Sequence, residues 1–234
     1  MKHLKSSALA LALIGVASTS VMAQSSKTNA WEGAYAQIGA GYGTFSPKIS
    51  NAVIHTGSSY GDVPASVSNI KDIGTGLVNL AVGYNFGINN NWMIGVGGTY
   101  YPGSSSGATA DMSSALTGAS TASYQVTKLY SIVLTPGYAI DSNRLVYAKV
   151  GYTGATIALS SPLIPFSKTN LNGYTFGLGY KQMLTSSFYA FGEVNHGTYG
   201  NVTASVTATA YNFPTNAQIK GSGTDYLVGI GYRF

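Results

Sequence analysis

The sequence predicts an all-β protein, folded as an eight-stranded antiparallel up-and-down transmembrane β-barrel. Three observations lead to this fold class. Only 8% of the 234 residues are charged, whereas soluble domains carry roughly 25%, so the chain lacks the charge to cover a water-facing surface. Glycine (30 residues) and tyrosine (18 residues) are abundant, while the hydrophobic content of 45% is ordinary. Repeated segments alternate bulky apolar with small or polar side chains, which is the period of a β-strand.

Residues 1–23 have the pattern of a cleaved secretory signal peptide. Lys2, His3 and Lys5 give a basic start, residues 8–16 form a short apolar run, and Val21-Met22-Ala23 supplies the cleavage site. An uncleaved membrane anchor is the alternative. We expect residues 24–234 to form a single barrel domain that has left the cytoplasm. That mature part has no run of about 20 apolar residues, the length that a transmembrane helix needs.

Composition also excludes several classes of function. The chain has no cysteine, which rules out disulfides, thiolate metal sites, a cysteine nucleophile and a lipid-modified cysteine. After removal of the signal peptide, ten basic and seven acidic residues remain, dispersed along the chain. That excess is too small and too scattered for a nucleic-acid binder.

Eight segments with period two are expected to be strands, in chain order 33–45, 76–87, 91–102, 123–140, 144–158, 172–183, 187–198 and 224–234. The bulky face of each, in the same order, carries Ile38 and Tyr42; Val78, Leu80 and Val82; Trp92, Ile94 and Val96; Tyr130, Ile132 and Leu134; Val146, Val150 and Tyr152; Tyr174, Phe176 and Leu178; Phe188 and Val194; and Tyr226, Val228 and Ile230. The opposite face of each strand consists mostly of glycine, threonine, serine and asparagine.

The connections between these strands alternate in length. Three short ones, at 87–90, 141–143 and 184–186, contain hairpin-turn residues, and the others are long: 46–75, 103–122, 159–171 and 199–223. Short turns at one end and long loops at the other are typical of an outer-membrane barrel, whose two termini then lie on the periplasmic side. Residues 202–210 also alternate, so one late strand is expected to continue above the membrane. Ten strands are the alternative count.

Closure of the sheet follows from the membrane environment. Each unpaired backbone N–H or C=O costs several kcal/mol in hydrocarbon, and only a closed sheet pairs them all. The bulky face then meets lipid and the small polar face points inward. A soluble barrel would reverse this arrangement, but it would need a charged exterior that neither face provides.

Aromatic residues cluster at the strand ends. We expect a periplasmic girdle from the aromatics nearest the short turns, which are Tyr84, Phe86, Trp92, Tyr138, Tyr180, Phe188, Tyr232 and Phe234. A second girdle at the outer end would contain Tyr42, Tyr100, Tyr124, Tyr152, Tyr174 and Tyr226. Amphipathic rings favour membrane–water interfaces, so two such bands are expected of a barrel in a bilayer.

Three stretches resemble a known family. The start of the first strand, Trp31-Glu32-Gly33-Ala34-Tyr35 with Gly41-Tyr42-Gly43, the fifth strand from Leu145 to Tyr152, and the seventh strand from Phe188 to His196 are similar to the small Gram-negative outer-membrane barrels called opacity-like or "porin family" proteins. Glu193 matches a recurrent glutamate of that family. Where the family commonly has an arginine and two tyrosines around it, this chain has Phe191, Val194 and His196.

The chain end resembles the signal read by the outer-membrane insertion machinery, with an aromatic last residue and alternating apolar residues before it: Tyr226, Val228, Ile230, Tyr232 and Phe234. The resemblance implies an eight-stranded monomer in the outer membrane. It also implies contacts with lipid and lipopolysaccharide, and assembly by the insertion machinery. The family includes adhesins, envelope-stabilising proteins and small-solute pores, so it implies no single activity.

A search for catalytic chemistry gives no candidate. His55 lies in a long loop, and His196 lies near the outer rim without the serine that a lipid A deacylase would have two residues later. No pair of acids is placed for a protease, and no His, Asp and Glu cluster has metal-ligand spacing. We therefore expect neither an enzyme nor a cofactor. Lys128 falls on the lipid-facing side near the outer end, where it could reach a lipopolysaccharide phosphate.

Four charged residues fall on the inward face of consecutive strands: Lys149, Lys181, Glu193 and Arg233. A charge inside a narrow barrel must be paired or hydrated, so we expect Glu193 to pair with one of the cations and to help close the lumen. Three cations against one anion would favour small anions in any open pore. The expected function is a structural or surface-interaction role in the envelope, with a surface ligand contacting the long loops. A narrow solute channel is the alternative.

Overall fold

A computed structural model describes residues 27–57, 61–162, 164–207 and 212–234, so the predicted signal peptide lies outside the described residues. The described chain contains ten strands: β1 (Gly33–His55), β2 (Asp62–Ser68), β3 (Ile73–Gly87), β4 (Trp92–Ser104), β5 (Ala108–Ser114), β6 (Gly118–Ala139), β7 (Arg144–Ser161), β8 (Ile164–Met183), β9 (Phe188–Thr207) and β10 (Pro214–Arg233). No helix in these ranges is long and apolar enough to cross a membrane.

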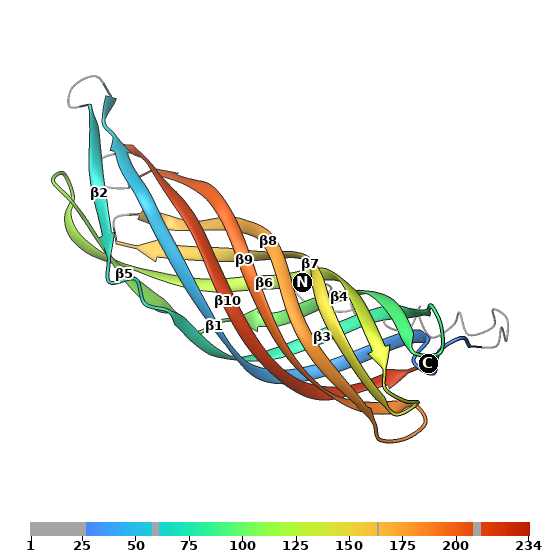
Figure 1. Cartoon of the computed structure of the whole chain (residues 1–234). Coiled ribbons are helices and arrows are strands. Elements are labelled where there is room, and N and C mark those ends of the chain that lie inside the picture. The colour runs from blue at the N-terminus through green and yellow to red at the C-terminus, as the bar shows by residue number, and fades with distance from the viewer. Residues whose placement is uncertain (1–26, 58–60, 163, 208–211) are drawn as a thin grey trace, which may run out of the picture.

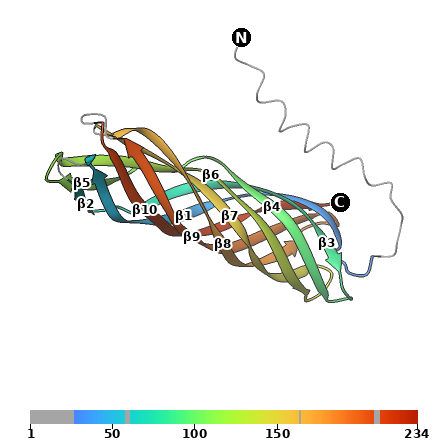
Figure 2. The ribbon, with the colours of Figure 1, turned by 90° about the horizontal axis from the view of Figure 1, so that it is seen from above.

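Eight of the strands form a closed antiparallel ring, which confirms the predicted fold class. The order is β1, β3, β4, β6, β7, β8, β9 and β10, and β10 pairs back onto β1 from Tyr35↔Arg233 to Ile54↔Thr215. The start of β1 and the C-terminus lie at one end of the barrel, and β2 and β5 lie at the opposite, outer end (Figures 1 and 2). Every strand of this ring has a partner on both sides, although the β3–β4 ladder ends at Leu80↔Tyr100.

The outer half of the molecule corrects the predicted long loops, because most of these residues are strand. β7 and β8 meet directly, with Ser161 paired to Ile164, so most of the described residues of 159–171 are paired strand rather than loop. β9 continues to Thr207, as the alternation in 202–210 predicted; residues 208–210 of that stretch lie outside the described residues. The two additional strands, β2 and β5, come from the first two loops and stand outside the eight-stranded ring.

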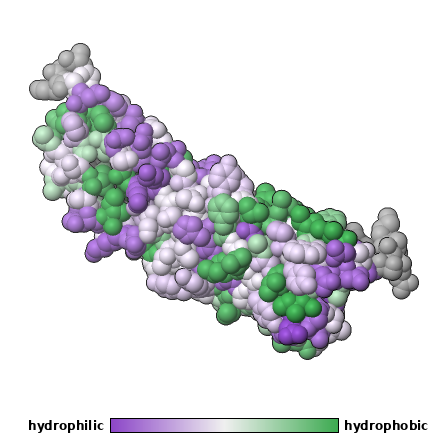
Figure 3. Space-filling model, in the orientation of Figure 1, coloured by the Kyte–Doolittle hydropathy of each residue, from purple (hydrophilic) through white to green (hydrophobic). Residues whose placement is uncertain are grey.

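Side-chain direction in the barrel follows the predicted alternation. Ile132, Leu178 and Val228 point outward and are 61%, 64% and 69% exposed, whereas lumen residues such as Asn79 and Thr135 are buried. In Figure 3, hydrophobic patches lie over the half of the molecule that contains the C-terminus, and hydrophilic side chains cover much of the outer end. The bulky face therefore forms the outer surface that meets lipid.

Tyr124 departs from the predicted outer girdle, since it is buried in the lumen. The cause is a bulge in β6 between Thr127 and Tyr130, where Lys128 adopts a φ of 52°. One extra residue in a strand reverses the direction of every side chain beyond it. The other five aromatics of the predicted outer girdle, Tyr42, Tyr100, Tyr152, Tyr174 and Tyr226, point outward.

Two apolar clusters fill the barrel at different heights. The lower cluster contains Trp31, Met93, Leu145, Tyr147, Tyr189 and Leu227. The upper cluster contains Phe45, Ile73, Tyr124, Ile157, Leu171, Tyr199 and Ile219. Polar residues and a cavity lie between them, and they form the candidate site.

Candidate functional site

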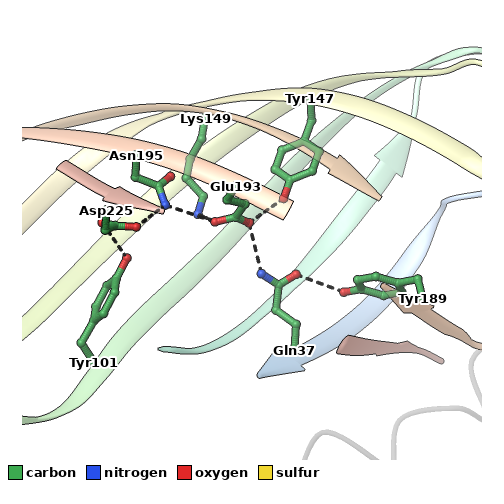
Figure 4. A network of polar contacts seen from close by, with 8 residues as sticks. All are labelled: Gln37, Tyr101, Tyr147, Lys149, Tyr189, Glu193, Asn195 and Asp225. Atoms are coloured by element: carbon green, nitrogen blue, oxygen red, sulfur yellow. Dashed lines mark hydrogen bonds and ion pairs between the residues drawn. The ribbon is translucent and has the colours of Figure 1, made fainter. Parts of the chain in front are cut away.

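Glu193 of β9 lies at the centre of a polar network in the lumen, which we call the Glu193 network (Figure 4). Lys149 Nζ lies 2.6 Å from Glu193 Oε2, and Tyr147 donates its hydroxyl to Oε1 at 2.5 Å. Gln37 Nε2 donates to Oε1 at 3.2 Å, and Asn195 Nδ2 donates to Oε2 at 3.3 Å. The Glu193 side chain is 2% exposed, so these four groups replace its hydration.

Glycines on β8 create the space in which this network forms. β8 lies between β7 and β9, and its Gly177 pairs with Lys149 on one side while Gly179 pairs with Glu193 on the other. A Cβ at Gly179 would overlap the Tyr147 ring, and one at Gly177 would overlap Asn195 Oδ1. Side chains of β7 and β9 therefore meet across β8 because β8 contributes no side chain at these two positions.

Lys181 lies beside the network but is held by aromatic rings. Its Nζ lies 4.2 Å from the Tyr35 ring centre, 4.8 Å from that of Tyr189 and 5.1 Å from that of Tyr147. The quadrupole of each ring attracts the ammonium group. Tyr189 also donates its hydroxyl to Gln37 Oε1 at 3.1 Å, which links this cage to the Glu193 network.

Arg233 is not part of the network, contrary to the sequence prediction. It donates to the carbonyl oxygens of Ala30 and Ser186 at the periplasmic rim, and its guanidinium lies 5.9 Å from the Trp31 ring centre. Glu193 pairs across the ladder with Leu227, six positions before Arg233. At about 3.3 Å per residue this places the two charges roughly 20 Å apart along the strand.

Asp225 of β10 extends the network toward the outer end, and sequence analysis did not single it out. Its Oδ1 accepts a hydrogen bond from Asn195 Nδ2 at 2.9 Å, and its Oδ2 accepts one from the Tyr101 hydroxyl at 3.3 Å. Asp225 could have been found from the sequence, because it falls on the inward-facing side of the last predicted strand. The described lumen thus contains two lysines, Lys149 and Lys181, and two carboxylates, Glu193 and Asp225, so the predicted excess of cations is absent there.

The periplasmic side of the lumen is filled below the network. Trp31, Leu145 and Tyr189 are each 1% exposed. Asn29 fixes the segment that carries Trp31, because its Oδ1 accepts from Trp31 N and its Nδ2 donates to the carbonyls of Asn89 and Asn90. The segment before β1 is therefore tied across the mouth of the barrel.

The predicted periplasmic girdle residues share one level of the outer surface. Trp92 and Tyr138 pair across the ladder with ring centres 5.1 Å apart, and Phe188 and Tyr232 do so at 5.0 Å. The rings of Tyr84 and Phe86 are in contact, as are those of Tyr232 and Phe234, and Tyr180 is exposed at the same end. All five residues of the predicted C-terminal signal, Tyr226, Val228, Ile230, Tyr232 and Phe234, point outward.

A closed barrel with an apolar outer surface, aromatic residues near its turns and a polar lumen defines a β-barrel membrane protein. The chain matches the family model described as "Outer membrane protein beta-barrel domain" over residues 9–234. It belongs to that family of Gram-negative proteins, and its place is the outer membrane.

One solved structure agrees with this fold, and two others are less similar. The outer membrane protein OprG from Pseudomonas aeruginosa is 16% identical, with a TM-score of 0.61 over 89% of this chain and 99% of that one. Ail, the attachment invasion locus protein of Yersinia pestis, solved with a heparin analogue, is 15% identical at a TM-score of 0.42 over 86% and 99%. The outer membrane protease OmpT from Escherichia coli is 12% identical at 0.46 over 87% and 97%. No curated protein matches the sequence.

Proposed function

We propose that this protein is a non-conducting, non-catalytic outer-membrane barrel with a structural or surface-interaction role in the envelope. The observation that carries the proposal is the filled lumen, in which the buried Lys149–Glu193 pair stands above the Trp31, Leu145 and Tyr189 side chains. An eight-stranded interior is only just wide enough for side chains. Within the described residues, no group of His, Asp and Glu could hold a metal ion.

Single-channel recording in planar bilayers tests the closed lumen. We expect the purified full-length mature chain to give no conductance steps. The double variant Trp31→Ala with Glu193→Ala shortens one side chain in the Glu193 network and one in the filled part below it. It should conduct, provided that heat-modifiable mobility on gels shows that it is folded. A matched variant on the lipid face, Phe176→Ala, should stay silent. Discrete steps from the wild-type protein would overturn the proposal in favour of the narrow channel.

The outer extension, formed by β2, β5 and the upper parts of β1 and β6–β10, supports the surface-interaction role. It is packed from within by the upper cluster, so it presents a rigid surface above the outer girdle. We infer that partners contact this surface, while the barrel below contacts lipid and lipopolysaccharide. Cells that display a chain whose β2 and β5 tips are replaced by short glycine–serine turns should lose adhesion to the surfaces that cells with the wild-type chain bind. Unchanged adhesion with equal surface display would leave only the structural role.

Residues 1–23 are proposed to be removed during export, which leaves Gln24 as the first residue of the mature domain. Intact-mass measurement of the protein from isolated outer membranes tests this assignment. A mass that includes residues 1–23 would favour the membrane anchor instead.

A further inference from the structure

The wall of the barrel is interrupted between β3 and β4. Their ladder ends at Leu80↔Tyr100, although β3 extends to Ile73 and β4 to Ser104. Beyond that pair β3 stays with β1, up to Phe45↔Ile73, and β4 stays with β6, up to Ser104↔Thr127. The two strands therefore diverge toward the outer end.

The topology explains this divergence. In the membrane, β1 and β6 are joined through β3 and β4, whereas above it they are joined through β2 and β5. The pair β2–β5 runs from Ala65↔Ser114 to Ser68↔Asp111. Among the described residues, isolated hydrogen bonds cross between the two connections, such as Lys71 N to Thr109 O at 3.1 Å and Ser106 N to Thr75 Oγ1 at 3.3 Å. An opening remains below them.

A cavity of about 100 Å³ lies behind this opening. Outward-facing Val78 and Lys128 line it together with lumen residues such as Ser131, Thr153 and Asp225. Since residues of both faces line one space, the cavity reaches the gap between β3 and β4. The Glu193 network closes it below, and Phe45, Ile73 and Tyr199 of the upper cluster lie above it.

The opening lies at the level of the outer aromatic residues. Tyr100 and Tyr130 pair across β4 and β6 just below it, and Tyr42 pairs with Gly76 on its β3 side. These rings mark the boundary between hydrocarbon and polar head groups. Unpaired backbone at that depth is tolerated where it lines a polar cavity. A molecule in the outer leaflet could therefore enter sideways with its chain still in lipid.

The lining determines which head group fits. Leu77, Val126 and Leu129 give the lining an apolar part, and the Asp225 carboxylate and the hydroxyls of Ser131, Thr153 and Thr175 give it a polar part. Asp225 has hydrogen bonds from Asn195 and Tyr101 but no cation within ion-pair distance among the described residues. Lys128 also lines the cavity, but it is exposed, so salt screens its charge.

We propose that this cavity is a binding site for a single-chain amphiphile with a primary-amine head group, taken laterally from the outer leaflet. The amine donates to Asp225 and the neighbouring hydroxyls, and the chain leaves through the opening between β3 and β4. An anionic head would meet the Asp225 carboxylate at close range and is excluded. The site goes beyond the proposed function and does not depend on it, because it lies at the outer end of the Glu193 network, above the Lys149–Glu193 pair that closes the lumen.

NMR of the protein in lipid nanodiscs tests the site with decylamine and decanoic acid as probes. Decylamine should give saturable shifts confined to Leu77, Ser131, Thr153 and Asp225, with an affinity at least about tenfold above that of decanoate. In Asp225→Asn this preference should fall severalfold, while Asp62→Asn, an exposed carboxylate at the outer tip, should keep it. Butylamine, added from water, should bind far more weakly if the ligand comes from the membrane.

Ser131→Phe, which fills the cavity, provides a second test, and it should abolish the shifts in a barrel whose remaining spectrum is unchanged. Several results would overturn the proposal: shifts that grow linearly with decylamine, equal binding of decanoate, an Asp225→Asn variant that keeps the preference, or butylamine binding as tightly as decylamine. Should Ser131→Phe fail to fold, the Asp225→Asn comparison still decides the matter.

Discussion

At the scale of single residues, the lumen depends on a buried charge pair that only glycine neighbours make possible. Lys149 and Glu193 approach to 2.6 Å across β8, where Gly177 and Gly179 leave room. Burying two charges is costly, so a pair of this kind contributes little net stability over an apolar core. Removing one partner, however, leaves the other charge buried and unpaired. The pair therefore specifies which side chains fill the lumen.

Glu193→Gln keeps the side-chain shape but leaves Lys149 without its counter-ion. We expect a loss of about 3 kcal/mol in the free energy of unfolding, because a buried ammonium is left uncompensated. Reversible urea unfolding in micelles measures the change. The double variant Glu193→Gln with Lys149→Met, which removes both charges, should recover most of the loss. A single variant as stable as the wild type would show that the pair is hydrated rather than buried.

Gly179 offers a second measurement at this scale. Gly179→Val places side-chain atoms where the Tyr147 ring lies, so Tyr147 must leave Glu193 or β8 must shift. Overpacking of this kind costs typically 1–3 kcal/mol. The same substitution at Gly192, where a Cβ meets no atom closer than 3.9 Å, is the matched control and should be far milder in the same urea assay. Equal losses would mean that strand flexibility, not the close approach, sets the requirement for glycine.

At the scale of elements, alternation along one strand predicted which face of each strand meets lipid. It failed where the direction or contact of a side chain depends on how two strands pair. The bulge at Lys128 reverses Tyr124, and no residue pattern marked it. Arg233 has the predicted parity but stands at a strand end, far from Glu193. The contact of Asp225 with Asn195 depends on the β9–β10 register, which neither strand contains alone.

The last strand should act mainly in assembly rather than in stability. Phe234 is 47% exposed; its backbone N–H bonds Ala34 O and its ring contacts Tyr232. Phe234→Ala should therefore leave unfolding in micelles nearly unchanged but reduce the amount of barrel recovered from the outer membrane of cells. Phe176→Ala, at a position that is 55% exposed on the lipid-facing side, should not affect recovery. Normal recovery of Phe234→Ala would remove the predicted insertion role.

β5 should make the outer extension sensitive to acid. Hydrogen bonds from Asn69 and Thr121 hold the pKa of Asp111 below its usual 3.8. A lowered carboxyl pKa in the folded state contributes stability that is present above the unfolded pKa and is lost as the pH falls through the folded one. Carboxyl carbon shifts of Asp111, followed below about pH 5, should show this low midpoint. In Asn69→Ala the midpoint should rise; an unchanged midpoint would contradict the assignment.

At the scale of the whole molecule, the protein consists of two stacked rings that share β1 and β6–β10 and exchange one strand pair for another. The lower ring is closed by β3 and β4, and the upper ring by β2 and β5. Continuous strands make the whole barrel rigid, but the exchange must leave one weak place in the wall. That place coincides with the cavity and with the outer aromatic level, so the position of the candidate ligand site follows from the topology.

Hydrogen–deuterium exchange of the nanodisc-embedded protein can test this two-ring architecture. Amides that face the gap, on β3 between Gly74 and Val78 and on β4 from Tyr101 to Ser104, lack a partner strand on one side. They should exchange much faster than amides of the same strands below Leu80 and Tyr100, and faster than those of β9 and β10 at the same height, which stay paired. Exchange depends on opening of the local hydrogen bonds, so uniform protection along β3 and β4 would mean that the wall is continuous. That result would contradict the proposed lateral entrance but not the proposal that the lower lumen is closed.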